Sequence, residues 1–315
     1  MSAMPSPAVW LTSLRPFSFT ASVMPVLLAV AIGFLVHQEV PESTVQLSLI
    51  VPFVVSALLM HSGTNVLNDY WDYRHGVDGF VRGKPDPDPT HTISQGLVSP
   101  RFMLITGNVY FVLAILVGGF IALYRGPLYF VAGLGGALGG YLYTGGRISL
   151  KYRALGDVAV FFLMGPALVL MAMWAILGTA PMAVMLRYVS VLSLPLAFLV
   201  TAILHGNNTR DIDRDRDAGI QTVAGLLGRK KSRNLFVLLL VAAYGAVVLS
   251  VGLSIVSYPV LMVFLTAPQA IKLARRVYQE DDGALVLLPM MTAQLHLQFS
   301  VLQIIGVGAQ LLWNL

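Results

Sequence analysis

The chain has 315 residues, of which 57% are hydrophobic and 11% are charged, and its mean hydropathy is +0.76. Soluble domains carry about 25% charged residues, so this composition excludes a water-soluble globular protein and indicates a membrane protein. The lack of cysteine excludes disulfides, thiolate metal sites and a cysteine nucleophile, and the net charge of +5 is interpreted as basic loops beside a membrane rather than nucleic-acid binding.

Long apolar segments recur along the sequence, and most approach the ~20 residues that span a bilayer as a helix. The first leads directly into the body of the protein, without the charged start of a secretory signal. The segments cover residues 17–37, 47–67, 101–124, 127–143, 157–178, 188–205, 234–256, 258–277 and 285–313. The sequence therefore predicts an all-α membrane protein with nine transmembrane helices in a single domain, residues 1–315.

Charged residues alternate between the predicted loops in a way that fixes an orientation. Of the 20 lysines and arginines, all but Arg125 and Arg187 fall in one set of alternate loops. Because basic residues mark the cytoplasmic side of a membrane protein, we expect a cytoplasmic N-terminus and an external C-terminus. All acidic residues except Glu39 and Glu42 lie on the same side. The cytoplasmic loops at about 68–100, 144–156 and 206–233 are therefore the expected catalytic face.

The first polar cluster, residues 65–78, begins where the second apolar segment ends. If the helix continues through it, its asparagines and aspartates recur at helical spacing and share one face. These residues are Asn65, Asn68, Asp69 and Asp72. Gly76 is a suitable helix terminator and would place Asp78 on the turn beyond. Like charges stacked on one helix face repel, so the cluster is costly unless a cation holds it.

The second polar cluster, residues 207–219, follows the sixth apolar segment. Asp211 and Asp215 are four residues apart on one helix face, and Asn207 and Asn208 lie a turn before them. A second pair, Asp213 and Asp217, falls on another face, where the interleaved arginines would pair with it. Those arginines are Arg210, Arg214 and Arg216.

Either cluster alone is typical of a solvated helix end, but two with the same pattern on one membrane face indicate a binding site. Carboxylate and amide oxygens without histidine or cysteine suit Mg²⁺ or Ca²⁺ and argue against zinc. A metal held this way bridges carboxylates to phosphate oxygens and neutralises the charge of a departing diphosphate. The residues therefore predict a metal–diphosphate site at the bilayer surface.

Other features receive structural interpretations. His61, His205 and His296 are interpreted as packing or hydrogen-bonding histidines. Of the three, His205 is the strongest candidate for a role as a ligand, because it directly precedes the second cluster. The glycine-rich run at 133–140 is interpreted as close helix packing. The polar stretch 79–95 is either a lid, a substrate-contacting loop or simply flexible.

The two motifs Asn68-Asp69-x-x-Asp72 and Asp211-x-x-x-Asp215 resemble those of the UbiA superfamily of membrane prenyltransferases. The chain is most similar to the menaquinone branch, 1,4-dihydroxy-2-naphthoate polyprenyltransferase. The stretches that carry this narrower resemblance are 14–16, 68–78, 96–100, 143–157 and 207–222. The chain departs from the usual patterns at Gly76, Ile220 and Arg147, where family members carry aspartate, lysine and proline. These departures bear on the acceptor more than on the metal site.

The resemblance implies a UbiA-type helix bundle with a lateral opening to lipid and Mg²⁺ as cofactor. It implies that Mg²⁺ is held on the diphosphate by Asp69, Asp72, Asp78, Asp211 and Asp215, of which all but Asp78 are also the expected catalytic residues. Asn68 and Asn208 would assist in binding substrate. Candidate phosphate contacts are Arg74, Lys151 and Arg153.

The implied reaction transfers a polyprenyl group from an allylic diphosphate to an aromatic acceptor, most simply 1,4-dihydroxy-2-naphthoate in menaquinone biosynthesis, in a bacterial inner membrane. Three alternatives stay open at this point. The acceptor could be 4-hydroxybenzoate, homogentisate or a glycerol phosphate. The chain could be a membrane transporter, since intramembrane acidic residues often mark ion paths, although its carboxylates lie at helix ends. It could also be a non-catalytic scaffold, although its carboxylates are intact.

Overall fold

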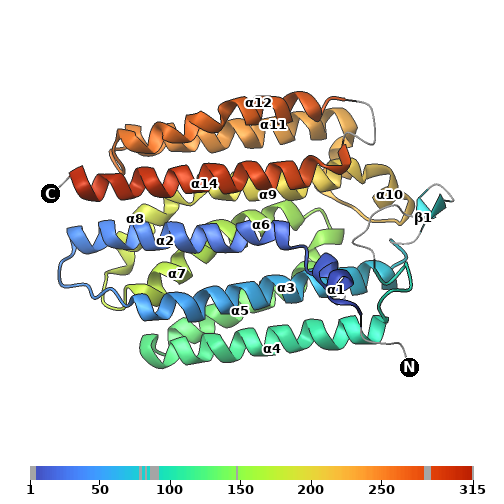
Figure 1. Ribbon diagram of the computed structural model, residues 1–315, viewed down its shortest axis with the longest axis horizontal. Helices are drawn as coiled ribbons and strands as arrows, with labels where there is room; N and C mark the ends of the chain where they lie inside the picture. The colour runs from blue at the N-terminus through green and yellow to red at the C-terminus, as the bar shows by residue number, and fades with distance from the viewer. Residues whose placement is uncertain are drawn as a thin grey trace.

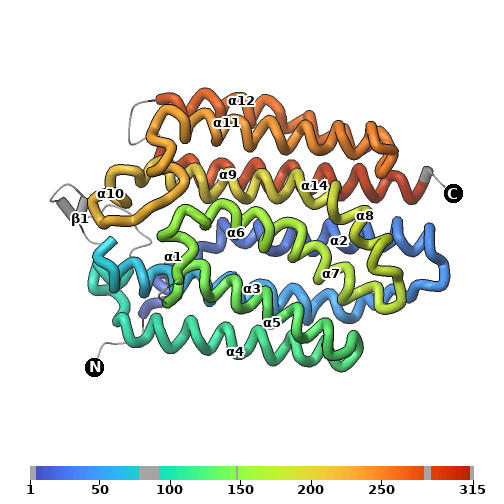
Figure 2. The backbone as a smooth tube through the Cα atoms, turned by 180° about the vertical axis from the view of Figure 1, so that it is seen from behind, coloured from blue at the N-terminus to red at the C-terminus, as the bar shows by residue number. Residues whose placement is uncertain are grey.

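The computed structural model describes residues 5–77, 80–81, 84–85, 92–146, 148–279 and 285–313. The predicted Asp78 and most of the 79–91 stretch lie outside these residues, as does Arg147. Long helices lie side by side along the long axis of the molecule, with α4 at one edge and α11 and α12 at the other (Figures 1 and 2). The prediction of an all-α protein is confirmed for the described chain, apart from a two-residue strand pair.

The first half of the chain contains six α-helices that alternate with shorter elements. In order they are α1 (Pro7–Leu14), η1 (Pro16–Phe19), α2 (Thr20–Glu39), η2 (Leu47–Leu49), α3 (Ile50–Arg74), β1 (Phe80–Val81), β2 (Lys84–Pro85), α4 (Pro100–Arg125), α5 (Pro127–Thr144), η3 (Leu150–Tyr152) and α6 (Gly156–Phe162). α4 and α5 form a tight antiparallel pair, because Gly126 adopts a positive φ of 85° and Pro127 starts the next helix.

The second half is built from more bent helices. The elements are η4 (Leu163–Ala167), α7 (Leu168–Ile176), α8 (Met182–Leu192), α9 (Leu194–Arg210), α10 (Ile212–Asp217), α11 (Val223–Gly252), η5 (Tyr258–Thr266), α12 (Ala267–Arg276) and α14 (Leu288–Trp313). η4 is a π-helical segment that contains Pro166, which cannot donate to the helix ladder. It joins α6 and α7 into one continuous but irregular span.

Each of the nine predicted apolar segments contains helical structure, but they are not equal as membrane spans. Within the described residues, six helices are long and apolar enough to cross a bilayer, and the pair α8–α9, bent by 49°, makes a seventh if it is counted as one span. The segment at 127–143 forms the short, glycine-rich α5 of 18 residues. The segment at 258–277 is divided between η5 and α12, and α12 is strongly basic at its end. The apolar core lies mainly between α2, α7, α9, α11 and α14.

The ends of the bundle differ in kind. α1, α10 and β1 gather at one end, while the C-terminus and α8 lie at the other (Figure 1). Trp10 of α1 packs against Phe102 of α4, with ring centroids 5.5 Å apart. The buried side chains of Val66, Val98 and Met103 continue this small core. This packing fixes the N-terminal helix across the end of α3, where the first polar cluster lies.

Close approach between α14 and η5 gives a test of the packing. A Cβ at Gly306 would lie 2.4 Å from the Val260 Cα, whereas a Cβ at Gly308 would meet no atom within 4 Å. We expect Gly306→Val to destabilise the protein by about 1–3 kcal/mol or more, as overpacking does, and Gly308→Val to have little effect. Thermal unfolding in detergent measures the difference; equal stability of the two variants would contradict the described contact between α14 and η5.

Candidate active site

The first polar cluster continues α3, as its spacing predicts. α3 runs to Arg74 without interruption, and Asn68, Asp69 and Asp72 are buried on it, Asp69 at 1% exposure. The helix ends at Gly76, whose φ is +71°. The Gly76 amide donates to the Tyr73 carbonyl and the next amide donates to the Asp72 carbonyl, at 3.2 and 2.9 Å. This is the paired hydrogen bonding of a Schellman cap, so the predicted helix terminator is confirmed.

The second polar cluster ends in the same way. α9 stops at Arg210, Asp211 links it to the short α10, and the Asp215 amide still donates to the Asp211 carbonyl at 2.8 Å. Gly219 has a φ of +72°, and the Ile220 amide donates to the Asp215 carbonyl at 2.8 Å. Asp72 and Asp215 therefore occupy equivalent places, each four residues before a left-handed glycine.

Asp72 is the centre of a polar cluster that joins α3 to the 144–156 loop. Its carboxylate accepts hydrogen bonds from Lys151 Nζ at 2.6 Å, Tyr152 Oη at 2.5 Å and Asn68 Nδ2 at 2.8 Å. Lys151 Nζ also donates to Asn68 Oδ1 at 3.0 Å. The predicted substrate-binding residues Asn68 and Lys151 are thus brought together around a buried carboxylate. Tyr152 was not predicted from the sequence.

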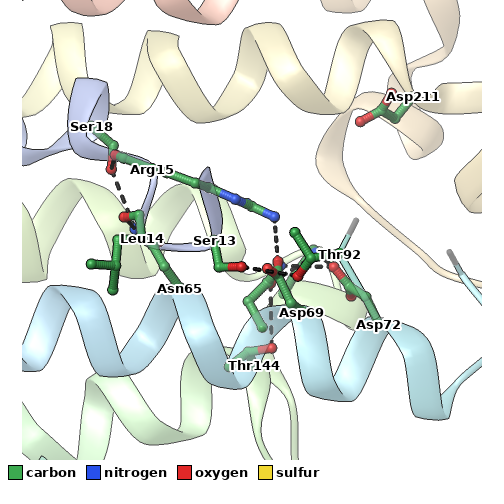
Figure 3. A network of polar contacts seen from close by, with 12 residues as sticks. Ser13, Leu14, Arg15, Ser18, Asn65, Asp69, Asp72, Thr92, Thr144 and Asp211 are labelled. Atoms are coloured by element: carbon green, nitrogen blue, oxygen red, sulfur yellow. Dashed lines mark hydrogen bonds and ion pairs between the residues drawn. The ribbon is translucent and has the colours of Figure 1, made fainter. Parts of the chain in front are cut away.

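Asp69 is paired with a residue from the N-terminal segment. Arg15, which separates α1 from η1 with a φ of +52°, donates from Nη2 to Asp69 Oδ1 at 2.5 Å. Figure 3 shows the Arg15 side chain reaching across to Asp69, with Asp72 further along the same helix and Asp211 on the facing element. In the sequence, Arg15 counted toward orientation alone. The available signal was that Arg15 precedes Pro16 and lies inside one of the stretches that carry the resemblance.

Arginines surround the carboxylates of the second cluster. Arg210 contacts both carboxylate oxygens of Asp211, at 2.7 and 2.8 Å, and Arg214 contacts Asp211 at 2.7 Å. Arg216 pairs with Asp213. The expected pairing of these arginines with the outer aspartates is confirmed for Arg216. The contacts of Arg210 and Arg214 with Asp211 follow from the helix break at Asp211, which leaves this residue between two helices rather than on a continuous face.

The two clusters face one cavity of about 950 Å³. α3 and the 144–156 loop contribute Asn68, Asp72 and Lys151 to its wall. α9 and α10 contribute Asn207, Asn208, Asp211, Asp213, Arg214 and Asp215. The remaining lining is mostly apolar and includes residues of α4, α5 and η4. Several glycines of the 133–140 run line this cavity, so their small size widens it as well as permitting the predicted close packing.

Asp215 has an unusual titration for a carboxyl group. Burial, together with the negative charges of Asp211 and Asp72, raises its pKa to about 7, although the positive charges of Lys151 and Arg214 act in the opposite direction. The carboxylates of the two clusters are therefore close enough to repel one another. A cation bound between them would relieve this repulsion.

The donor chemistry of the cavity suits Mg²⁺. Its polar end presents carboxylate and amide oxygens, which Mg²⁺ prefers. Within the described part of the chain, no three acidic or histidine side chains converge into a ready-made metal cluster. Mg²⁺ is commonly bound through one or two carboxylates together with substrate phosphates rather than by a cage of protein ligands. Asp72 facing Asp211 and Asp215 across the cavity fits this mode.

A buried hydrogen-bond network lies behind the second cluster. It includes Asp157 and Ser232, which the sequence analysis did not single out. His205 Nδ1 contacts Asp157 Oδ2 at 2.6 Å, and Asn208 Nδ2 donates to Asp157 Oδ1 at 3.1 Å. Thr209 donates to the His205 carbonyl, and Ser232 therefore donates to Thr209, 2.5 Å away.

His205 Nε2 therefore faces two acceptors, the Ser232 carbonyl oxygen and the Ser232 hydroxyl oxygen, whose proton is donated to Thr209. Both nitrogens of His205 therefore have hydrogen-bond partners, Asp157 at Nδ1 and Ser232 at Nε2. His205 is a hydrogen-bonding histidine, as predicted, and its specific role is to hold Asp157 against Asn208.

Two predicted phosphate contacts lie elsewhere. Arg74 and Arg153 are exposed, and neither belongs to the lining of the cavity. The backbone of Arg153 pairs with Gln221 in a parallel bridge, which ties the 144–156 loop to the segment after α10. Asp69 is also absent from the cavity lining, since it is buried against Arg15.

Comparison with known proteins agrees with this architecture. The model of the UbiA prenyltransferase family matches residues 22–293. UbiA prenyltransferase domain-containing protein 1 from Danio rerio is 34% identical over 316 residues, which covers 95% of this chain and 84% of the relative. The human protein of that name is 32% identical over 308 residues, covering 95% and 83%.

Solved structures share the fold at low sequence identity. The apo structure of a UbiA homolog from Aeropyrum pernix K1 has a TM-score of 0.67 at 16% identity, covering 93% of this chain and 97% of the homolog. A UbiA homolog from Archaeoglobus fulgidus, bound to GPP and Mg²⁺, has a TM-score of 0.57 at 15% identity, covering 94% and 99%. The helix arrangement is therefore that of a UbiA protein.

The buried His205–Asp157 pair makes a stability prediction. Asp157→Asn keeps the shape of the side chain but puts an NH2 group in place of one of the two oxygens that contact His205 and Asn208, so we expect a loss of about 1–3 kcal/mol, the cost of a buried polar group left unpaired. Asp217→Asn, at an exposed position of α10, is the matched control and should be near neutral. Thermal unfolding in detergent compares them; a neutral Asp157→Asn would contradict the described contacts of Asp157.

Proposed function

The chain belongs to the UbiA prenyltransferase family, and from this premise we propose that it transfers a polyprenyl group from an allylic diphosphate to an aromatic acceptor. The observation that carries the proposal is the pairing of two Asn/Asp helix ends, on α3 and α9–α10, across a cavity that is otherwise apolar. The anionic diphosphate of such a donor needs polar and charged contacts, and its isoprenoid tail needs apolar ones. The Archaeoglobus homolog named above was solved with GPP and Mg²⁺, which supports the choice of donor.

We propose that Mg²⁺ is held by Asp72, Asp211 and Asp215, with Asp69 and Asp78 completing the set around the diphosphate. When bound, the metal would supply the positive charge that a departing diphosphate requires. Lys151 and Arg214 face the cavity from the two clusters and would neutralise phosphate oxygens. Arg74 and Arg153 are proposed as further phosphate contacts. Asn68 and Asn208, each held by a buried hydrogen bond, would orient the substrate.

The chain would protect the reaction by excluding water. Departure of the diphosphate leaves an allylic cation, the electron-rich ring of the acceptor attacks it, and the attacked ring carbon then loses a proton or, in the naphthoate case, its carboxylate as CO₂. The apolar walls from α4, α5 and η4 would keep water away from the cation during its lifetime. We propose 1,4-dihydroxy-2-naphthoate as the acceptor on the strength of the sequence resemblance alone. The animal relatives named above carry a different name, so they support the family rather than this acceptor.

We also propose nine membrane crossings, with the N-terminus and the catalytic cavity on the cytoplasmic side. The supporting observations are the helical character of all nine apolar segments and the placement of nearly all basic residues at one end. Six or seven spans follow from length and hydropathy, and α5 and η5–α12 would complete the nine. The proposed location is a cell membrane. The expectation of a bacterial inner membrane draws no support from the animal relatives.

Product formation by the purified protein tests the proposal. In detergent, with geranylgeranyl diphosphate and a panel of aromatic acceptors, we expect product with Mg²⁺ and none with EDTA. Asp72→Asn and Asp211→Asn should each lower turnover about 100-fold or more, as loss of a group that stabilises developing charge does. Asp217→Asn is the control. Turnover of another acceptor alone would overturn the naphthoate assignment. Product formation in EDTA would overturn the proposed requirement for Mg²⁺.

The raised pKa of Asp215 predicts how the Mg²⁺ requirement changes with pH. A carboxyl with a pKa of about 7 is mostly protonated at pH 6 and must lose that proton to bind metal. The Mg²⁺ concentration for half-maximal activity should therefore be about tenfold higher at pH 6 than at pH 8, the ratio for a single displaced proton. In Asp215→Asn this difference should disappear; its persistence would assign the titration to another group.

A further inference from the structure

The cavity has two chemically different walls below the acidic clusters. The side formed by η1, α2 and α3 includes polar side chains, namely Ser18, Ser22, His61, Thr64 and Asn65, among apolar ones such as Phe53 and Met60. The side formed by α4, α5 and η4 presents apolar groups such as Ile115, Phe130 and Met164. An isoprenoid chain is satisfied by the second wall but offers no hydrogen-bond donor to an acceptor on the first. The polar side chains of the first wall therefore suit an occupant that can donate a hydrogen bond.

The hydrogen bonds of this wall determine the tautomer of His61. The Ser18 hydroxyl donates to the Arg15 carbonyl at 2.8 Å, so its oxygen can only accept from His61 Nε2, 3.0 Å away. The proton of the neutral ring is thus on Nε2, and Nδ1 carries a lone pair. Ser22 lies 2.7 Å from Nδ1 and must donate its proton there.

This chain of bonds leaves Ser22 as an acceptor. With its proton committed to His61, the Ser22 oxygen retains lone pairs, and nothing else in the described part of the chain bonds to it. Ser22 belongs to the cavity lining. Phe19 packs edge-on against the His61 ring, with centroids 5.5 Å apart, and restrains its orientation. The site is therefore a fixed acceptor that suits a hydroxyl group of a ligand.

The depth of this group suits the second substrate. His61 precedes Asn68 by seven residues on α3, which places it about 10 Å deeper along the helix. A diphosphate held at the acidic clusters would put its reacting carbon between these levels. A ring that attacks this carbon would extend alongside it toward the polar wall, where one ring hydroxyl would meet Ser22.

We propose that Ser22 accepts a hydrogen bond from a ring hydroxyl of the aromatic acceptor, and that His61 acts as a positioning residue that fixes the Ser22 proton. The inference rests on the proposed function and deepens it, because it assigns the acceptor a place in the cavity. A ring without that hydroxyl would leave the Ser22 lone pairs unpaired.

Acceptor analogues test the proposal. The kcat/KM is measured with geranylgeranyl diphosphate and Mg²⁺ for 1,4-dihydroxy-2-naphthoate, 1-hydroxy-2-naphthoate and 4-hydroxy-2-naphthoate. Ser22→Ala should lower it about three- to tenfold, the factor for loss of one neutral hydrogen bond, for the acceptors that carry the bound hydroxyl. The analogue without this hydroxyl should be unaffected. The ratio of variant to wild type cancels the intrinsic reactivity of each ring.

Variants of His61 and a second serine complete the design. His61→Phe should reproduce the hydroxyl-selective loss, and His61→Asn, which keeps a polar atom near Nδ1, should recover part of it. Ser56→Ala is the matched control. The Ser56 hydroxyl, on α3, donates to the Ala114 carbonyl, so its removal should change kcat/KM by the same factor for all three acceptors. An unchanged KM for the prenyl diphosphate shows that each variant is folded.

The outcomes separate two failures. Equal losses on all three acceptors in Ser22→Ala, with turnover by the wild type intact, would overturn this inference and leave the proposed function standing. Turnover of no aromatic acceptor by the wild type would overturn the proposed function and this inference together.

Discussion

Compensation of buried negative charge is the constraint on which this structure depends. Asp72 is 4% exposed at the end of a membrane-spanning helix, and an uncompensated carboxylate there would cost several kcal/mol. Lys151 and Tyr152 provide the compensation from a loop some 80 residues away in sequence, at contacts of 2.6 and 2.5 Å. The 144–156 loop must therefore fold over the end of α3. Its position in turn brings α6, with Asp157, against α9.

The same principle organises the rest of the acidic end. Asp69 requires Arg15, which ties the N-terminal helix to α3, and Asp211 requires Arg210 and Arg214. Asp69, Asp72 and Asp211 each have a cationic partner, whereas burial and the negative charges of Asp211 and Asp72 raise the pKa of Asp215. The basic residues stabilise the fold without removing the demand for a further cation. A binding site for a charged substrate and a stable helix end are thus obtained from the same side chains.

Sequence reasoning succeeded where the geometry is local. Helical spacing placed Asn68 beside Asp72, and Gly76 ends α3 as predicted, because contacts at three and four residues follow from the helix itself. Pairings such as Arg15 with Asp69 and His205 with Asp157 were not predicted, since they join residues about 50 positions apart and depend on how helices pack. The resemblance supplied Lys151, which spacing alone would not have identified. It gave no reason to separate Lys151 from Arg153, whose side chain is exposed.

The two Schellman caps bear on how an inorganic diphosphate product would leave the cavity. Both α3 and α10 point their C-terminal ends at the acidic end of the cavity, and a helix carries about half a negative charge at that end. These backbone dipoles add to the field of the aspartates and cannot be neutralised by titration. If the chain binds a prenyl diphosphate as proposed, these dipoles would weaken the hold on the inorganic diphosphate once its cation has dissociated, and so favour its release.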